Sequence, residues 1–273
     1  APADEQAYAV GAFDVFNVEM AEGVLRAAEA LRSPLIFAHV ERHESLISIE
    51  ALAALLLKLV EKASIPVCLH LDHADNLAEV KKAIDCGFTS VMMDASELPL
   101  SENIAMTRQV VDIAHPLGIS VEAELGHVSG NETADGRIDD YEVYTEVTES
   151  VKFLAQTEVD ALAISVGTVH GVYKSAPKLN FERCTDIKKA TGNLPLVLHG
   201  GSGLSDEDFS HFIRCGVNKI NIFTDLTLAA IANLRDADLS GKTPYFKLSE
   251  MVTNAIQEAT ERKIRQFGSA GKA

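Results

Sequence analysis

Eight short apolar runs recur along the 273-residue chain, and each is followed by a longer stretch in which apolar residues repeat at helical spacing. The runs indicate β-strands, and the i, i+3, i+4 spacing between them indicates amphipathic helices. Strands that alternate with helices favour a parallel sheet, because parallel strands need a crossover connection. The predicted strands are residues 8–13, 34–39, 66–71, 90–93, 119–124, 161–165, 194–198 and 219–222.

Eight strand–helix units in a chain of this length predict an α/β fold, the (β/α)8 TIM barrel, which typically takes about 250 residues. An open, doubly wound sheet is the alternative. No G-x-G-x-x-G motif follows the first strand, which disfavours the dinucleotide-binding form of that sheet. Residues 223–273 follow the last strand and predict extra C-terminal helices around a Gly-Lys-Thr-Pro turn. No stretch has the composition of a linker, so we expect one domain over residues 1–273.

The chain is acidic, with 40 Asp and Glu against 24 Lys and Arg and a net charge of −16. Such a surface repels phosphate backbones and anionic lipid, so we expect no nucleic-acid or membrane partner. No apolar run reaches the roughly 18 residues of a spanning helix, and no signal peptide opens the chain. The four cysteines, Cys68, Cys86, Cys184 and Cys215, form no C-x-x-C pair, which indicates buried free thiols in a reducing cytoplasm.

Polar residues gather at the carboxyl ends of six consecutive predicted strands, and in a barrel these ends converge on one mouth. Each residue alone has a structural explanation: a single histidine is often a hydrogen-bonded core residue, and Asp206 and Asp225 fit helix N-caps. Their coincidence at one end favours a site. The residues are His70, Asp72, His73, Asp94, Glu122, Glu124, Ser165, His170, His199, Asn221 and Thr224.

Three of these residues, His73, His170 and His199, could supply the neutral imidazoles of a catalytic zinc with an open fourth position. The His-Gly-Gly-Ser-Gly turn at 199–203 would present backbone N–H groups at a helix N-terminus, which suits a phosphate. A metal beside a phosphate site suggests chemistry on a phosphorylated carbonyl compound. Asp72, next to His73, is placed for proton transfer.

At these residues the sequence resembles the class II fructose/tagatose-bisphosphate aldolase family, from about residue 8 to the end. The motifs occur in order and with family-like spacing. They are LHLDHADN (69–76), SVMMDASELPLSENI (90–104), VEAELGHVSGNE (121–132), VGTVHGVYK (166–174), LVLHGGSG (196–203), KINIFTD (219–225) and RQFGSAGKA (265–273).

The resemblance implies a role for each matching residue. His73, His170 and His199 would hold the catalytic zinc, and Asp94 and Glu124 would belong to a second metal position. Asp72 would protonate the aldehyde oxygen, and Glu132 would be the base at the dihydroxyacetone-phosphate carbon. Family members often bind a monovalent cation (Na⁺ or K⁺) near the phosphate and form homodimers or homotetramers. The phosphate and ketose site would comprise Gly171, Gly200, Gly201, Ser202, Asn221, Ile222, Phe223 and Thr224.

The implied reaction is the reversible cleavage of a phosphorylated ketose, a ketose bisphosphate or a ketose 1-phosphate, to dihydroxyacetone phosphate and an aldehyde. Zinc would stabilise the enediolate, and no Schiff-base lysine is needed or found at a strand end in the required place. A metal-dependent sugar-phosphate isomerase or epimerase and a non-catalytic, aldolase-like partner subunit are the alternatives. The latter should have lost ligands, and all are present.

Departures from the family pattern concern the acceptor end of the substrate. After the second predicted strand, where the family tends to have small residues, the chain reads His-Val-Glu-Arg-His at 39–43. Position 223 is Phe where small or acidic residues are usual, and the late helix has no Arg between Lys247 and Arg262. We therefore expect an acceptor other than glyceraldehyde 3-phosphate, with Arg42 or His43 contacting its distal end.

Overall fold

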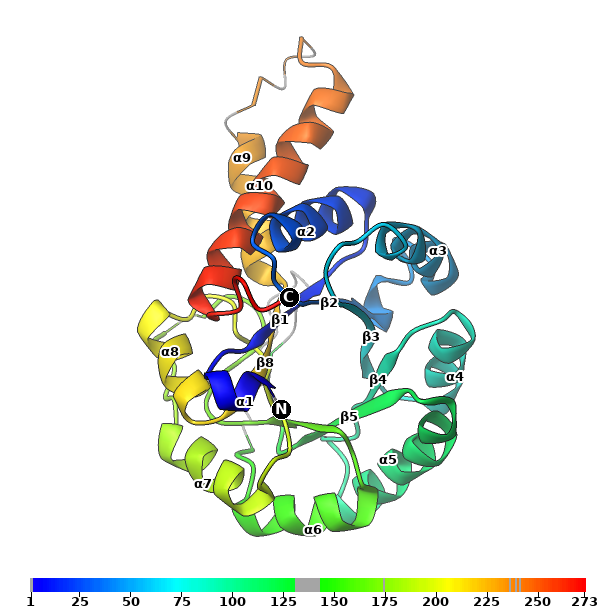
Figure 1. Ribbon diagram of the computed structural model, residues 1–273, viewed down its shortest axis with the longest axis vertical. Helices are drawn as coiled ribbons and strands as arrows, with labels where there is room; N and C mark the ends of the chain where they lie inside the picture. Colours follow the sequence, from blue (N-terminus) through cyan, green and yellow to red (C-terminus); the bar gives the residue numbers. More distant parts are fainter. Residues whose placement is uncertain (1, 131–142, 174, 236, 239, 241) are drawn as a thin grey trace.

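The computed structural model describes residues 2–130, 143–173, 175–235, 237–238, 240 and 242–273. Eight parallel strands close into a barrel in sequence order, with β1 hydrogen-bonded to both β2 and β8 (Figure 1). Ala12 of β1 pairs with Asn221 of β8, so the sheet has no free edge; this confirms the barrel and excludes the open sheet. The strands are β1 (Val10–Asp14), β2 (Leu35–Val40), β3 (Val67–Ala74), β4 (Ser90–Met93), β5 (Ser120–Leu125), β6 (Ala161–Ile164), β7 (Leu196–Leu198) and β8 (Val217–Ile222).

A ring of helices surrounds the strands, as Figure 1 shows, and covers them with the apolar face that the helical spacing predicts. A short helix precedes β1, and two 3₁₀ turns follow β2 and α5. The bounds are α1 (Pro2–Gln6), α2 (Val18–Ala30), η1 (Glu41–His43), α3 (Ile49–Val60), α4 (Leu77–Asp85), α5 (Leu100–Ala114), η2 (His115–Leu117), α6 (Val147–Thr157), α7 (Phe181–Thr191), α8 (Asp206–Arg214), α9 (Thr224–Arg235) and α10 (Tyr245–Gln266).

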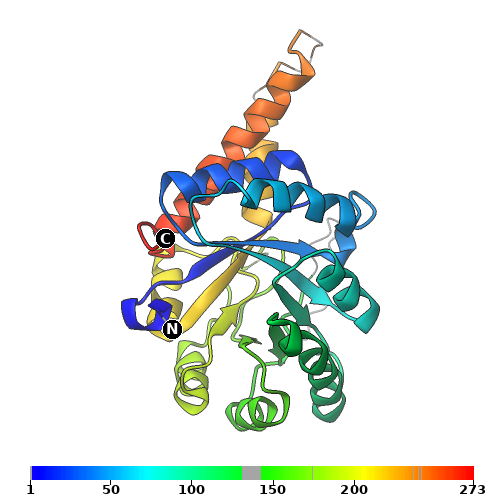
Figure 2. The same cartoon turned by 45° about the vertical axis from the view of Figure 1, so that its right-hand side comes forward.

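The extra C-terminal helices are α9 and α10, which lie against each other and project past the ring of helices (Figures 1 and 2). The lower part of α10 packs along α2. Among the described residues no helix is long and apolar enough to cross a membrane.

Two expected helix caps are wrong. Asp206 is the first residue of α8, and Ser205 caps that helix, because its hydroxyl accepts from the backbone N–H of Asp208 in a capping box. Asp225 lies inside the first turn of α9 and forms an ion pair with Lys263, with 2.6 Å between Oδ2 and Nζ.

The cysteines are free, as expected, but only two of them are buried. Cys184 and Cys215 lie in the core between α7 and α8. Cys68, near the start of β3, and Cys86, the C-cap of α4, are half-buried.

Candidate active site

The end of β3 departs from the regular alternation of a strand. The pairing of β3 with β4 shifts register between Leu71 and Ala74, and His73 has a left-handed backbone with φ of +49°. In a regular strand Asp72 and His73 would face opposite sides of the sheet. Here both approach one another, with 3.9 Å between Asp72 Oδ2 and His73 Nε2. The irregularity therefore brings two consecutive residues to the same site.

Three histidines meet at the barrel mouth from the ends of β3, β6 and β7. The ring centroids of His73 and His199 are 4.5 Å apart, and those of His73 and His170 are 5.0 Å apart. One nitrogen from each of the three imidazoles lies within 4.8 Å of the other two. His73 Nε2 and His199 Nδ1 are buried and have no hydrogen-bond partner among the described residues. Since buried polar atoms are nearly always paired, these nitrogens fit a metal ion.

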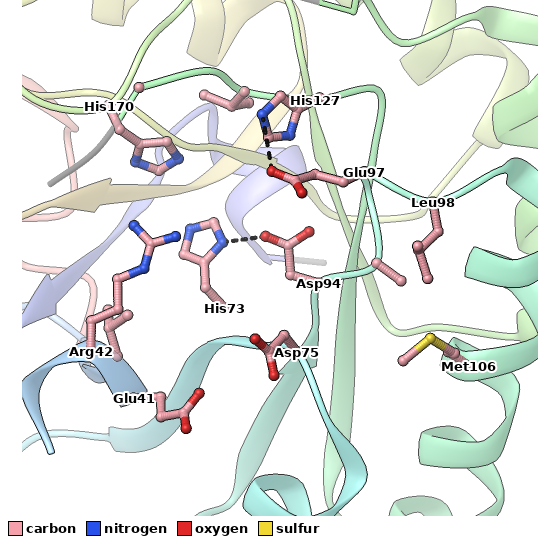
Figure 3. Close-up of a pocket in the computed structure, with 14 residues that line it drawn as sticks. Glu41, Arg42, His73, Asp75, Asp94, Glu97, Leu98, Met106, His127 and His170 are labelled. Atoms are coloured by element: carbon pink, nitrogen blue, oxygen red, sulfur yellow. Dashed lines mark hydrogen bonds and ion pairs between the residues drawn. The ribbon is translucent and has the colours of Figure 1, made fainter. Parts of the chain in front are cut away.

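Two carboxylates adjoin this cluster. Asp94 Oδ2 lies 2.7 Å from His73 Nδ1 (Figure 3), and one ligand atom each of His73, Asp94 and Glu124 also lie within 4.8 Å of one another. Glu124 Oε2 lies 3.0 Å from His199 Nδ1 without hydrogen-bond geometry, and its Oε1 accepts from the backbone N–H of Val128. The carboxylates of Asp94 and Glu124 thus provide a second set of donor atoms beside His73, and the second metal position stays a prediction.

The carboxylates strongly affect the imidazoles. Burial alone would lower the pKa of His73, but Asp72 and Asp94 raise it to about 9. For His199 the pKa rises to about 10, because Glu122 and Glu124 outweigh burial. Despite burial, the neighbouring histidines hold the pKa of Asp72 well below its usual range. The metal-free protein therefore carries protons on His73 and His199 at neutral pH.

This protonation predicts that zinc binding weakens in acid. A histidine must lose its proton before it can bind a metal. Below pH 9, each proton that zinc must displace therefore raises the zinc Kd about tenfold for every unit by which the pH falls. We expect the Kd, titrated against a competing chelator, to rise steeply from pH 8 to pH 6. Zinc binding that is independent of pH over this range would contradict the protonation states described above.

Asp72 is buried like His199, with 1% of the residue exposed against 0% for His199. Its Oδ2 accepts from Asn221 Nδ2 at 2.8 Å. Asn221, expected at the phosphate, thus contacts the proposed proton donor. Glu132, the expected base, lies outside the described residues.

A cavity of about 630 Å³ is lined by His73 and His170 of the histidine cluster (Figure 3). Arg42, from η1, points into it toward His73, and is the only Arg or Lys among its described lining residues. His43 is buried instead, with its ring centroid 4.9 Å from that of Phe223, and neither residue lines the cavity. The remaining charged or titratable lining residues are Glu41, His73, Asp75, Asp94, Glu97, His127 and His170.

The expected phosphate turn is tightly packed. Gly200 has φ of +65°, and a Cβ there would meet the carbonyl oxygen of Val169 at 2.5 Å, so the position requires glycine. The Ser202 hydroxyl accepts from the backbone N–H of Asp225, which holds the turn beside the start of α9. The other residues expected at the phosphate lie around this turn. Gly201 packs closely on β8, and Gly171 also has a left-handed backbone. Ile222 is fully buried, and Thr224 is the first residue of α9.

A buried cluster lies below the histidines: His70 and Glu122, both expected at the mouth, contact Lys219, which the sequence did not single out. Lys219 Nζ contacts both carboxylate oxygens of Glu122, at 2.9 and 2.7 Å. Burial alone would raise the pKa of Glu122, but Lys219 and His70 lower it to about 2. One sequence signal could have identified Lys219. It stands two residues before Asn221, so both side chains lie on one face of β8.

The family model described as "Fructose-bisphosphate aldolase class-II" matches residues 1–272. The chain belongs to this family. Its members named as aldolases are lyases, and the closed eight-stranded barrel described above is the fold of its structural neighbours.

Several proteins named as aldolases are similar to the chain over nearly their full length. The 6-phospho-5-dehydro-2-deoxy-D-gluconate aldolase of Shouchella clausii is 40% identical and covers 100% of this chain and 94% of its own length. The fructose-bisphosphate aldolase of Staphylococcus aureus is 39% identical, with 99% and 96% covered. The crystal structure of the YdjI aldolase of Escherichia coli K12 superposes with a TM-score of 0.89 at 37% identity, covering 100% and 96% of the two chains.

Proposed function

We propose that the protein is a zinc-dependent aldolase that reversibly cleaves a phosphorylated ketose to dihydroxyacetone phosphate and an aldehyde. The observation that carries the proposal is the convergence of three imidazoles that leaves His73 Nε2 and His199 Nδ1 buried and without a hydrogen-bond partner among the described residues. His73, His170 and His199 would hold the zinc. When bound, zinc would act as a Lewis acid on the substrate carbonyl.

The protein's own groups would handle the proton and the phosphate. Asp72, with its low pKa, is a carboxylate in the resting protein. It would accept the hydroxyl proton during cleavage and return it to the aldehyde oxygen during condensation. Glu132 would exchange the proton at the dihydroxyacetone-phosphate carbon. The backbone amides of the Gly200–Gly201 turn and the start of α9 would bind the phosphate, with a monovalent cation nearby.

A coupled assay of dihydroxyacetone-phosphate release tests the proposal. We would measure a panel of ketose 1-phosphates and bisphosphates with and without zinc, and expect zinc-dependent turnover of at least one. Interconversion of sugar phosphates without release of dihydroxyacetone phosphate would instead support the isomerase alternative. Turnover of no substrate by zinc-loaded protein would support a non-catalytic subunit.

We further propose that the acceptor aldehyde carries a carboxylate and is not glyceraldehyde 3-phosphate. Arg42 is the only described Arg or Lys that lines the cavity, and its guanidinium points toward the histidine cluster. Arginine suits carboxylates because it can bind both oxygens at once. The Shouchella clausii relative is named for a gluconate, which is a sugar acid. The neighbouring Glu41, Asp75 and Glu97 would repel an anion placed away from Arg42.

Replacing Arg42 by methionine is expected to lower kcat/KM for a carboxylate-bearing aldehyde about tenfold or more, because a charged hydrogen bond contributes roughly 1.5–3 kcal/mol. A neutral aldehyde of the same length should change little. Steady-state condensation rates with carboxylate, phosphate and neutral aldehydes measure this. Arg26→Met, in an exposed pair with Glu22 on α2, is the matched control. Fructose 1,6-bisphosphate emerging as clearly the best cleavage substrate would contradict the proposed acceptor.

We also propose a cytoplasmic homodimer or homotetramer. Support comes from the exposed apolar side chains of the projecting helices, Leu228 and Ile231 of α9 and Tyr245 and Phe246 of α10. Light scattering of the purified protein measures the assembly directly.

A further inference from the structure

A layer of polar side chains fills the barrel one step below the candidate metal site. The layer consists of three residues, and each stands two positions before a residue of the site above. Glu122 precedes Glu124, His70 precedes Asp72, and Lys219 precedes Asn221. In a strand such pairs point the same way, so the three form a layer nearer the amino ends of the strands. All are buried, with exposures of 1% for His70, 2% for Glu122 and 7% for Lys219.

The Lys219 ammonium has three donors, and the layer supplies three acceptors. Two are the oxygens of Glu122, at 2.9 and 2.7 Å, and the third is His70 Nε2, at 3.1 Å. His70 Nδ1 lies 2.8 Å from Ser90 Oγ, so His70 can donate to the serine while it accepts from lysine. This arrangement fixes the position of the Glu122 carboxylate from below.

The Glu122 carboxylate in turn contacts a candidate metal ligand. Its Oε1 lies 3.2 Å from His199 Nε2. Since an ionised carboxylate only accepts hydrogen bonds, Nε2–H of His199 must be the donor. The opposite nitrogen, Nδ1, is the one that faces the second carboxylate set and has no hydrogen-bond partner among the described residues. The contact therefore fixes both the tautomer and the orientation of the imidazole.

Fold stability does not account for this layer. TIM-barrel interiors are dominated by Val, Ile and Leu, and a buried ion pair is often no more stabilising than apolar residues of similar volume. Its distinguishing property is the contact with His199.

We propose that Lys219 is a positioning residue for the metal site: it holds Glu122 on His199 Nε2, so that His199 Nδ1 is presented to the ion. The inference rests on the proposed zinc site. It assigns a function to a lysine that does not itself reach the metal or the substrate.

The test measures zinc affinity of purified, metal-stripped protein, by competition with a chromophoric chelator at pH 8. Lys219→Met is expected to raise the zinc Kd about 10- to 100-fold, the usual effect of losing a group that orients a ligand. Lys219→Arg keeps the positive charge and should bind zinc more tightly than Lys219→Met. Lys188→Met removes another lysine ion pair, with Asp4 at the far end of the barrel, and should reduce stability without changing the Kd.

A folded Lys219→Met variant with wild-type zinc affinity would overturn the inference. If that variant does not fold, the double variant Lys219→Met/Glu122→Met serves in its place, because it removes the acceptor for His199 and leaves neither charge unpaired; the same loss of affinity supports the inference and wild-type affinity overturns it. Failure of the wild-type protein to bind zinc would instead refute the proposed metal site. The inference alone is refuted if the wild-type protein binds zinc and cleaves substrate, and the variants bind zinc as tightly as the wild-type protein.

Discussion

Stripping the protein of metal with a chelator is expected to abolish release of dihydroxyacetone phosphate, with a loss of about 10³-fold or more. Lewis-acid stabilisation by a metal contributes several kcal/mol to such reactions, and each 1.4 kcal/mol corresponds to tenfold in rate. Without zinc, His73 and His199 carry protons, because their pKa values are about 9 and 10. Two imidazolium groups would then occupy the site in place of a coordinated ion.

The measurement is a coupled assay before chelation, after chelation, and after titration with zinc, with metal content followed by elemental analysis. Activity should return in proportion to bound zinc. The coupling enzyme, assayed alone under each condition, is the control. Full turnover by protein shown to contain no metal would rule out the zinc mechanism.

The second large effect is expected at Asp72. Asp72→Ala should lower kcat for cleavage by about 10²-fold or more, since a positioned acid–base group contributes 10²–10⁴-fold. Asp72→Asn is the sharper variant, because its carbonyl oxygen can still accept from Asn221 Nδ2 while it can no longer take a proton. Zinc content must be measured for both, because Asp72 lies 3.9 Å from the nearest nitrogens of His73 and His199.

A partial reaction separates the role of Asp72 from binding. Exchange of the dihydroxyacetone-phosphate carbon proton with solvent needs no aldehyde, so both variants should retain it. Asp85→Asn, an exposed carboxylate at the end of α4, controls for the change in charge. A wild-type cleavage rate in Asp72→Asn would assign the proton transfer to another residue.

The barrel and the grouping of its histidines could be predicted from the sequence because both follow from strand order. The carboxyl ends of β3, β6 and β7 meet at one mouth in a closed barrel, so residues as distant as His73 and His199 become neighbours. Apolar runs locate the strands to within a few residues. The predicted eighth strand, for example, began at Lys219, whereas β8 begins at Val217.

Other features depended on contacts that no pattern reveals. Lys219 stood at the predicted start of a strand, where a lysine usually reaches solvent, and only the closed barrel puts it against Glu122. Arg42 and His43 were equal candidates for the acceptor, and η1 turns only the first into the cavity. Glu132 stays a prediction.

The left-handed backbone at His73 restricts which residues can replace it. Asparagine, aspartate, histidine and glycine tolerate such a conformation, whereas β-branched residues do not. A residue that replaces His73 must therefore offer a metal-donor atom and tolerate the left-handed backbone. Apart from histidine, aspartate is the residue that meets both requirements with a strong donor. His73→Asp is thus a short mutational route by which the proposed zinc ligand could be replaced by an oxygen donor, which suits harder ions such as manganese.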